Sequence, residues 1–596
     1  MKKHILCALV TGYSVFNYSN AHAQFIPGDV SSVGLTHAVP DVAIWYDGTG
    51  NGQVKIGPID VAKQFADNDT WEPWVSVLGE KVFLIQCEKF VDDGTFNTIG
   101  TPPNAGSQRY VLAFQPAAVG TSANAKLGEC FYDDSGNRYT NQISSRQNGN
   151  PGRVYGDRRY DGTNIATGGE ANPQNYGSFF NSDSRFALTN PLYGQDPTMR
   201  CGLIQTFSVN LSTFAQTPLC KAFDGNSFGH PDFLARTDAS NQQRGRFGGG
   251  IAALDNGNFA AVIDDRSPFF EGGAPGNETI ALVFKPDGSV VTNSFLVRPA
   301  EAWTDPCGFK GGFCVRSGGL LYFYNNNGNL IVGDVDHNAL SGLTLDTGRG
   351  DGTKIAGDIR TPYVFYAGGG WLTVWNGTNG AYLAQFQYTD GMEAVNTVNR
   401  TDVACDSLGN VCVAWDGRPT TDLVGTNSDQ SFALNQIMAR VFHFDAATTN
   451  LAPITSVFFP FVNHDGNTNS ILGYRMENSN LDMTTRYICI AGKGLINSSN
   501  NVAGGPDSKP QTTVYTVINN PGYVPPKMSI ARSGGNLIIS WAASAGDGVL
   551  QSTAALQPIN WADVSPQPPS TLVNGNTYQK TVAIGGANLF LRLAVP

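Results

Sequence analysis

Short runs of apolar, β-favouring residues alternate with polar turns along most of this chain. The stretch Thr401–Arg418 shows the unit clearly, because the apolar runs 403–405 and 411–415 flank a turn of Asp, Ser, Leu, Gly and Asn. Branched and aromatic residues favour strands, whereas Asp, Ser, Asn and Gly favour tight turns. The pattern therefore predicts a β-hairpin, and the stretch 249–263 predicts a second hairpin of the same kind.

The strand and turn pattern recurs on both sides of this hairpin. It predicts further strands or hairpins within 74–85, 109–114, 186–188, 202–209, 278–291, 313–332, 363–386, 437–444, 454–459, 486–496 and 512–518. The interval 128–184 is rich in Asn, Gly, Asp and Arg and predicts loops or insertions instead.

The spacing of the turns indicates a repeated unit. Glycines assigned to first turns lie at 318, 369 and 409, so the spacings are 51 and 40 residues, close to the about 40 to 50 residues of a four-stranded propeller blade. The predicted fold is therefore all-β, with a β-propeller of about seven blades whose first turns lie near 79, 184, 257, 318, 369, 409 and 493. Six and eight blades stay open as alternatives.

A string of β-sandwiches is the rival architecture, and it would need separate cores of about 100 residues with linkers between them. The shorter period with paired turns favours the propeller. The segment 41–46 is predicted to pair with the last strands and close the ring, which would remove exposed strand edges.

The propeller is predicted to occupy residues 24–520, a stiff Pro-rich linker 521–527, and a small β module 528–596. The module resembles a C-terminal domain of many large secreted bacterial proteins in its segments Leu537–Trp541, Gly548–Thr553, Asn560–Trp561 and Asn588–Leu593. The resemblance implies an immunoglobulin-like or fibronectin-like β-sandwich that acts as a sorting or spacer module, with no activity attached. Its Trp541 and Trp561 are predicted core anchors. The preceding part resembles uncharacterised secreted bacterial β-propeller-like repeat proteins.

The first 23 residues predict a secretory signal peptide, since Lys2 and Lys3 precede an apolar run and 21–23 forms an A-x-A site. Cleavage would leave a secreted protein, either extracellular, on the cell surface or periplasmic. No later apolar run is long enough to cross a bilayer, so membrane insertion is not expected.

The net charge of −11 opposes nonspecific binding to nucleic acid and to anionic membranes, so neither is a predicted partner. Charged residues make up only 15% of the chain beside 69 Gly, 34 Phe and 21 Tyr, which agrees with turns and aromatic strands rather than charged helical faces.

Cysteines are predicted to form disulfides if the chain is exported. Pairing of sequence neighbours joins Cys87 with Cys130, Cys201 with Cys220, Cys307 with Cys314 and Cys405 with Cys412, although other connectivities stay open. Cys489 is left over and is predicted to be a buried thiol in a strand.

The first candidate site is the Arg-rich stretch 153–170. Its candidate catalytic residues are Asp157, Arg158, Arg159, Tyr160 and Glu170, and Arg153 is a candidate binding residue. Arginines beside carboxylates and a Tyr are the groups that sialidase propellers use on acidic sugars, but the Asp-box S-x-D-x-G-x-T-W is absent. A solvated loop held by Arg–Asp pairs is the structural alternative.

A second candidate binding set consists of Arg246, Asp264, Asp265, Arg266 and the sugar-stacking candidate Trp303, with core packing as the alternative for the Trp. Asp255 belongs to a turn and is interpreted as structural.

Calcium is the one cofactor considered. Asp334, Asp336 and Asp351 lie in segments with alternating oxygen-bearing residues, yet neither segment fits the D-x-[DN]-x-[DN]-G loop with its following Glu. Turn chemistry explains these aspartates equally well.

Three function classes follow. A secreted, non-catalytic scaffold that binds an extracellular glycan or protein comes first, because the fold offers a broad rim and no catalytic motif stands out. A carbohydrate-active enzyme, either a sialidase-like hydrolase or a polysaccharide lyase, is the alternative that would use the Arg-rich stretch. A surface or matrix component is the third.

Overall fold

The computed structural model describes residues 37–46, 52–56, 69–78, 82–91, 106–114, 126–128, 154–160, 164–171, 201–210, 215–223, 247–265, 278–299, 304–343, 353–390, 398–417, 436–461, 471–476, 480–496, 511–523, 527–542, 549–553, 562–566, 568–573, 577–583 and 590–594. The predicted signal peptide and the predicted strand 186–188 lie outside these residues. Within them no helix is long and apolar enough to cross a membrane.

Almost every described element is a β-strand, as the alternating pattern predicted. Up to residue 519 the described strands form seven antiparallel sheets, six of them four-stranded. The first three four-stranded sheets contain β3 (Asp69–Leu78), β4 (Val82–Val91), β5 (Gly106–Phe114) and β6 (Lys126–Gly128); β7 (Val154–Tyr160), β8 (Asn164–Ala171), β9 (Cys201–Asn210) and β10 (Ala215–Phe223); and β11 (Phe247–Ala253), β12 (Phe259–Asp265), β13 (Glu278–Phe284) and β14 (Val290–Arg298).

The next three follow the same order along the chain. They contain β15 (Thr304–Phe309), β16 (Gly312–Ser317), β17 (Leu320–Asn325) and β18 (Leu330–Asp336), followed by the one-turn helix α4 (His337–Ser341); β19 (Thr353–Gly357), β20 (Tyr363–Gly368), β21 (Trp371–Asn376) and β22 (Ala381–Gln387); and β23 (Val398–Cys405), β24 (Asn410–Gly417), β25 (Gln436–Asp445) and β26 (Asn450–Pro453).

The seventh sheet, called the closing sheet below, joins the two ends of this region. Its strands are β1 (His37–Tyr46), β2 (Gly52–Ile56), β27 (Ile471–Arg475), β28 (Leu481–Met483), β29 (Tyr487–Ile496) and β30 (Gln511–Asn519). β1 pairs antiparallel with β30, with Ala43 opposite Val514 and Ile44 opposite Thr513. The predicted pairing of 41–46 with the final strands is therefore confirmed.

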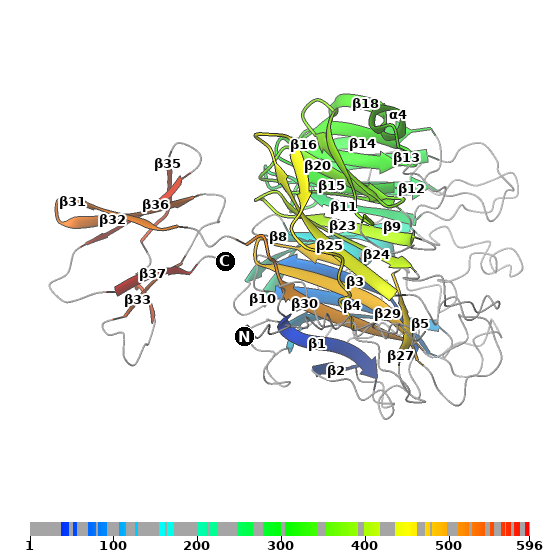
Figure 1. The fold of residues 1–596 in the computed structure, drawn as a ribbon, viewed down its shortest axis with the longest axis horizontal. Helices are drawn as coiled ribbons and strands as arrows, with labels where there is room; N and C mark the ends of the chain where they lie inside the picture. Colours follow the sequence, from blue (N-terminus) through cyan, green and yellow to red (C-terminus); the bar gives the residue numbers. More distant parts are fainter. Residues whose placement is uncertain are drawn as a thin grey trace, which may run out of the picture.

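One strand of each sheet contacts the corresponding strand of the next sheet. These ring strands are β3, β7, β11, β15, β19, β23 and β28, and β28 contacts β3 again. The sheets lie face to face along the body in Figure 1. The result is a propeller-like all-β arrangement, because four-stranded meanders follow one another around a closed ring of contacts.

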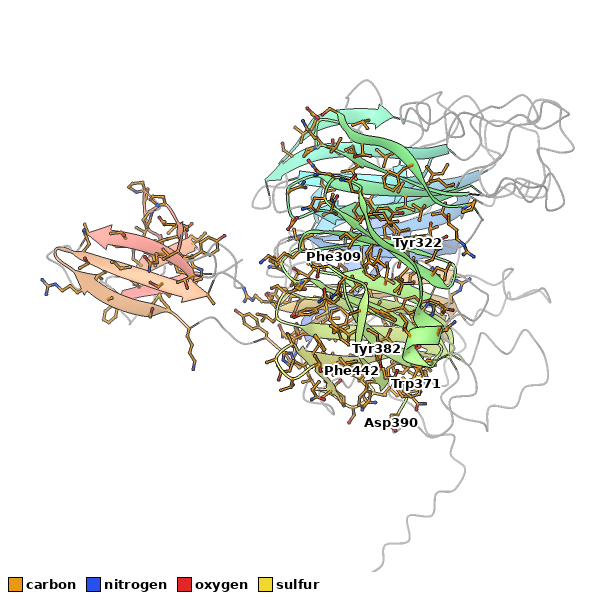
Figure 2. The ribbon with its side chains drawn as sticks, turned by 90° about the horizontal axis from the view of Figure 1, so that it is seen from above. Phe309, Tyr322, Trp371, Tyr382, Asp390 and Phe442 are labelled. Atoms are coloured by element: carbon orange, nitrogen blue, oxygen red, sulfur yellow. The ribbon has the colours of Figure 1, made fainter. Side chains whose placement is uncertain are left out.

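Apolar side chains fill the spaces between successive sheets (Figure 2). One cluster joins the sheets that hold Phe313 and Val283, and a second joins those that hold Phe323 and Trp375. A third joins Phe365 to Trp415, and a fourth joins Ala414 to Ile490 of the closing sheet. The sheets β15–β18, β19–β22 and β23–β26 are thus apolar on both faces, which explains the fully buried strands β16 and β24.

Two glycines permit the close approach of neighbouring ring strands. A Cβ on Gly308 would overlap the carbonyl oxygen of Ala253 on β11, and a Cβ on Gly357 would overlap the carbonyl oxygen of Gly308. The ring strands therefore meet backbone to backbone at this level, where no side chain fits.

Several predictions of local structure were wrong. The interval 128–184, predicted as loops, contains the hairpin β7–β8, in which Arg158 pairs with Thr167. Gly318 and Gly369 lie in second turns, and 493 lies inside β29. Strands β15 and β19 were not predicted, and residues 454–459 form only an isolated bridge from Phe458 to Ala439.

The C-terminal strands lie apart from the ring of sheets in Figures 1 and 2. They are β31 (Ser529–Ser533), β32 (Asn536–Ala542), β33 (Val549–Thr553), β34 (Ala562–Asp563), β35 (Thr571–Val573), β36 (Thr577–Ala583) and β37 (Phe590–Ala594), in a four-stranded and a three-stranded sheet. Ile539, Trp541 and Leu550 form their shared core. The prediction for Trp541 is confirmed, and Trp561 lies outside the described residues.

Candidate functional site: the carboxylates of the ring strands

Aspartates on the ring strands connect one strand to the next. The Asp305 carboxylate on β15 accepts a hydrogen bond from the backbone N–H of Ile355 on β19, at 2.9 Å. Asp402 on β23 accepts one from Leu481 N–H on β28, at 2.9 Å, and Asp482 on β28 accepts one from Val77 N–H on β3, at 2.7 Å. Because ring strands lack a ladder partner on their inner side, these carboxylates satisfy backbone donors that would otherwise lose their partners.

Lys354 occupies the corresponding place on β19, since Thr-Asp at 304–305 and 401–402 is replaced by Thr-Lys at 353–354. The Lys354 charge lowers the pKa of Asp402, and the Asp305 charge raises it. Burial is the largest influence, and together these effects raise the pKa of Asp402 to about 7. A buried carboxyl that titrates near neutral pH therefore lies on the ring.

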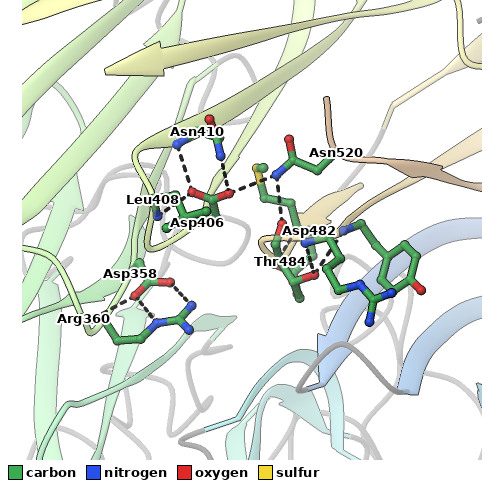
Figure 3. A network of polar contacts seen from close by, with 11 residues as sticks. Asp358, Arg360, Asp406, Leu408, Asn410, Asp482, Thr484 and Asn520 are labelled. Atoms are coloured by element: carbon green, nitrogen blue, oxygen red, sulfur yellow. Dashed lines mark hydrogen bonds and ion pairs between the residues drawn. The ribbon is translucent and has the colours of Figure 1, made fainter. Parts of the chain in front are cut away.

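A network at the β23–β24 turn fixes the end of the closing sheet (Figure 3). Asp406 accepts hydrogen bonds from Leu408 N–H at 2.8 Å and from both the backbone N–H and the side-chain amide of Asn410, at 2.9 and 2.7 Å. The Asn520 side-chain amide is a fourth donor, at 2.9 Å. Asn520 also donates to Thr484 O at 3.2 Å, so the network connects the turn to β28 and to the residues after β30.

Burial raises the pKa of Asp406 while its hydrogen bonds with Asn410 and Leu408 oppose that change. Asp358 lies near enough to raise it further, although its own charge is paired with Arg360 through contacts of 2.9 and 2.7 Å. Arg360 is 47% exposed, so this ion pair contributes little to stability.

Asp416 makes a further contact between the same two sheets. It is fully buried on β24 and accepts hydrogen bonds from Arg400 N–H at 2.8 Å and Met476 N–H at 3.2 Å. The Arg400 guanidinium donates to Met476 O at 2.8 Å. Three carboxylates of the β23–β24 hairpin therefore hold the closing sheet.

The structure places the Arg-rich candidates on strands rather than on a loop. Asp157, Arg158, Arg159 and Tyr160 belong to the ring strand β7, and Glu170 belongs to β8, opposite Tyr155 and Gly202. Arg153 lies outside the described residues. The stretch is therefore a hairpin rather than a loop, because residues 165–171 of β8 pair with both β7 and β9.

The second candidate set is only partly described. Asp264 and Asp265 end β12, where they pair with Thr279 and Glu278 of β13. Arg246, Arg266 and Trp303 lie outside the described residues. Asp255 accepts a hydrogen bond from Gly311 N–H of the next sheet at 2.9 Å and another from the Asn326 side chain, which supports its structural interpretation.

The calcium candidates do not come together. Asp334 accepts the Tyr322 hydroxyl at 2.7 Å, with a backbone φ of +52° at a β-bulge, whereas Asp336 caps α4 by accepting from the N–H groups of Asn338 and Ala339. Asp351 lies outside the described residues. Within the described part of the chain, no group of His, Cys, Asp and Glu has the arrangement of a metal site.

Two predicted disulfides are contradicted by the structure. Cys405 pairs with Val411 and Cys412 with Ala404, so the two thiols lie on opposite faces of their sheet and cannot bond. The described cysteines form no disulfide, and all five are buried.

Cys307 and Cys314 are directly opposite each other on β15 and β16, but each thiol has a different neighbour. Cys307 faces Gly357, where a Cβ would lie 3.3 Å from its sulfur, and the backbone of Tyr322 hydrogen-bonds to Cys314. The side chains of Cys87, Cys201 and Cys220, and the whole of Cys130, lie outside the described part, so those two pairings stay predictions. Cys489 is a buried thiol in β29, as predicted.

Sequence reasoning missed the ring carboxylates. The signal that identifies Asp305 and Asp402 is the repeated Thr-Asp or Thr-Lys at 304–305, 353–354 and 401–402, which recurs after 49 and then 48 residues, whereas Asp482 follows a Leu and lies outside this pattern. It was hidden because Pro306, Gly308 and Gly357 lower the strand propensity of two of these segments.

The comparisons with solved structures give low TM-scores and low sequence identities. No protein-family model matches the sequence, and no curated protein matches it. A protein of unknown function from Dyadobacter fermentans DSM 18053 is similar with a TM-score of 0.36 and 11% identity, over 82% of this chain and 99% of that one. A putative 6-phosphogluconolactonase from Bacteroides fragilis NCTC 9343 is similar with a TM-score of 0.31 and 10% identity, over 88% of this chain and 99% of that one.

The Penicillium chrysogenum alpha-L-arabinanase complexed with arabinobiose gives a TM-score of 0.27 and 10% identity, over 58% of this chain and 84% of that one. Likeness at this level carries no argument about the activity of this chain. The class of protein is defined by the chain's own sheets, as an all-β protein with a propeller-like ring closed between its first and last strands.

Proposed function

We propose that this chain is a secreted binding or scaffold protein, built as a seven-bladed β-propeller with a C-terminal β-sandwich, and that its partner is an extracellular glycan or protein. Support for seven blades comes from the seven ring strands, each in contact with the next. Support for the sandwich comes from two small sheets that share the core residues Ile539, Trp541 and Leu550.

The observation that carries the binding proposal is the position of β7. This ring strand lies between β3 and β11, and its sequence includes Asp157, Arg158, Arg159 and Tyr160. Propeller ligands commonly bind over the central channel, and guanidinium groups recognise carboxylates in bidentate fashion. An acidic glycan is therefore the first ligand class to test.

The ring suits a binding platform because its carboxylates hold the scaffold together. Asp305, Asp402 and Asp482 each accept a backbone N–H of the neighbouring ring strand. A hydrogen bond to a neutral carboxyl contributes about 1 kcal/mol, and one to an ionised carboxylate about 1.5–3 kcal/mol. Such connections would keep the blades in place when a ligand binds, which limits the entropy lost on binding.

The test is retention of the purified protein on acidic and neutral polysaccharides, with an assay for released reducing or unsaturated ends in the same samples. We expect retention on acidic polysaccharides without release, and weaker retention for Arg158→Ala and Arg159→Ala. Arg532→Ala is the matched control, because this exposed arginine belongs to β31 of the C-terminal module.

Release of sugar ends that is lost in Arg158→Ala or Glu170→Ala would replace the scaffold proposal by the carbohydrate-active enzyme. Equal retention of all three arginine variants would refute the role of β7. Export is tested separately by the mature N-terminus, which is expected at Gln24 in protein recovered outside the cytoplasm.

A further inference from the structure

The interface between the sheet β23–β26 and the closing sheet, called the closing joint below, is held by three buried carboxylates on one hairpin. Asp402 accepts the N–H of Leu481, Asp406 accepts the side-chain amide of Asn520, and Asp416 accepts the N–H of Met476. Their residues are 5%, 1% and 0% exposed, so water contributes little to their solvation. An apolar cluster that includes Ala414, Ile437, Leu481 and Ile490 completes the joint.

The three carboxylates differ in how their charge is solvated by the protein. Asp406 has four N–H donors, two of them on the Asn410 residue alone. Asp402 has two described donors, the backbone N–H groups of Leu481 and Val403, both at 2.9 Å. Asp416 also accepts from two backbone N–H groups, but its donor Arg400 carries a guanidinium that bonds to the same Met476, whereas the Asp305 charge acts on Asp402. A buried carboxylate with few donors and a nearby negative charge is the costlier one to ionise, so Asp402 is the proton-sensitive member of the joint.

The charged groups around Asp402 come from several ring strands. Lys354 on β19 stabilises its ionised form, and Asp305 on β15 opposes it. Asp482 on β28 follows the donor Leu481, and on β24 the pKa of Cys412 is raised by burial and by the Asp402 charge. The other titratable side chains described on β20, β23 and β24 have contacts elsewhere. On β20, Tyr363 contacts Phe444 and Tyr366 stacks on His337. On β23 the Arg400 guanidinium donates to Met476 O, and Cys405 packs in the apolar cluster of Val403 and Phe442. Asp416 on β24 accepts from the N–H groups of Arg400 and Met476.

We infer that the closing joint is a proton-responsive device: it is tightest in acidic medium and loosens as the pH rises toward neutral, with Asp402 as the sensor. Ionisation places a buried charge between β23 and β28 that Lys354 and two N–H groups stabilise only in part, and that the Asp305 charge opposes. This regulation goes beyond the proposed binding function and does not depend on it.

The direction follows from proton linkage. Asp402 in the closed joint holds its proton up to a pKa of about 7, whereas an exposed aspartate loses it near its ordinary pKa of 3.8. Between these values the closed form binds one more proton than the opened form, so closing is favoured at the acid end and disfavoured as the pH rises. Above about pH 7 both forms are ionised, and this contribution no longer changes.

The test is hydrogen exchange of the full-length protein between about pH 5 and pH 8.5, read as the protection factor of the peptide that contains Leu481–Met483 after correction for intrinsic exchange rates. The opening constant is expected to rise by up to about tenfold per pH unit below the Asp402 pKa and to level off above it. The central strand Leu320–Asn325 of another sheet is the internal reference and should show no such change.

Asp402→Asn keeps the shape of the side chain and removes the titration, so its Leu481 protection should lose this pH dependence. Two further variants shift the pH window, which is the pH range over which the opening constant rises, in opposite directions. Lys354→Met removes the stabilising cation and moves the end of the window to higher pH, while Asp305→Asn removes the opposing charge and moves it to lower pH.

A purely structural role of Asp402 would not produce these opposite shifts. The inference fails if wild-type Leu481 protection is independent of pH, if it changes equally in Leu320–Asn325, or if Asp402→Asn retains the wild-type profile. Should Asp402→Asn not fold, the Lys354→Met and Asp305→Asn pair decides the question, and identical windows in both would overturn the proposal.

Discussion

At the scale of single residues, the ring depends on carboxylates at some positions and on the absence of a side chain at others. Asp305, Asp402 and Asp482 satisfy backbone N–H groups across neighbouring strands. Gly308 and Gly357 let the same strands approach so closely that a Cβ would overlap a carbonyl oxygen. Both devices serve the same contact, because strands that meet edge to edge must satisfy donors and avoid side-chain bulk.

Gly308→Ala is expected to lower the free energy of unfolding of the ring by about 3 kcal/mol or more, since the new methyl group meets the fixed backbone of Ala253 rather than a flexible side chain. Urea denaturation followed by tryptophan fluorescence measures this. Gly257→Ala is the control, because its φ of +82° opposes a side chain but nothing lies within 4 Å, and a loss of only about 1 kcal/mol is expected. Equal losses in the two variants would contradict the close-approach argument.

At the scale of elements, the turn after β30 is part of the ring rather than a free linker. Asn520 donates to Asp406 and accepts from Gly522 N–H at 3.0 Å, while Asn410 donates to Gly522 O at 3.2 Å. The first residues of the predicted linker 521–527 are therefore fixed to the β23–β24 turn. The start of the connection to the C-terminal module thus has a defined place on the ring.

Asn520→Asp replaces the donor to Asp406 by a second carboxylate. The two acids would have to share a proton, which raises the pKa of one of them in the folded state, so stability should fall as the pH rises. We expect a loss of about 2–3 kcal/mol at pH 8 and a smaller loss at pH 5, measured by thermal unfolding. Asn379→Asp is the control, because its side chain accepts from Ala381 N–H and an aspartate can do the same. A loss independent of pH would contradict this prediction.

Many of the strands and turns could be predicted from the sequence, and the strands that were missed share one cause. The hairpins at Thr401–Arg418 and 249–263 carry apolar runs on both sides of a strong turn, and both were predicted correctly. The segments of β15, β19 and β7 contain Pro, Gly or several charges, so local propensity argues against strands there. Pro306 is tolerated because β15 is the edge strand of its own sheet, and only contacts between sheets make these segments strands.

Two turns were assigned to the wrong place in the repeat for the same reason. Gly318 and Gly369 have about the right spacing but mark second turns, since the weak ring strand before each of them was overlooked. The carboxylates of the candidate site lie on those overlooked strands or on their neighbours. Their contacts between sheets join residues 50 to 405 positions apart, and no local pattern contains that information.

At the scale of the whole molecule, two units are expected to unfold separately. The C-terminal strands have their own core around Trp541, whose ring centroid lies 5.8 Å from that of Tyr578. Deletion of residues 528–596 should leave the main unfolding transition of the ring within about 2 °C of the full-length value in calorimetry, with loss of a smaller transition. Loss of the ring transition on deletion would show that the two units fold as one.

Closure of the ring depends on β1, which lies between β2 and β30 in the closing sheet. Ala43 is opposite Lys55 on one side and Val514 on the other, so it occupies an interior strand. Ala43→Pro removes a backbone N–H and restricts φ there, and it should destabilise the ring by about 3 kcal/mol or more. Because β30 would then present an unpaired edge, we also expect concentration-dependent association in light scattering. Ala43→Ser keeps the N–H and nearly the same volume, so it should remain monodisperse and unfold like the wild type. If Ala43→Pro behaves in the same way, β1 does not close the ring.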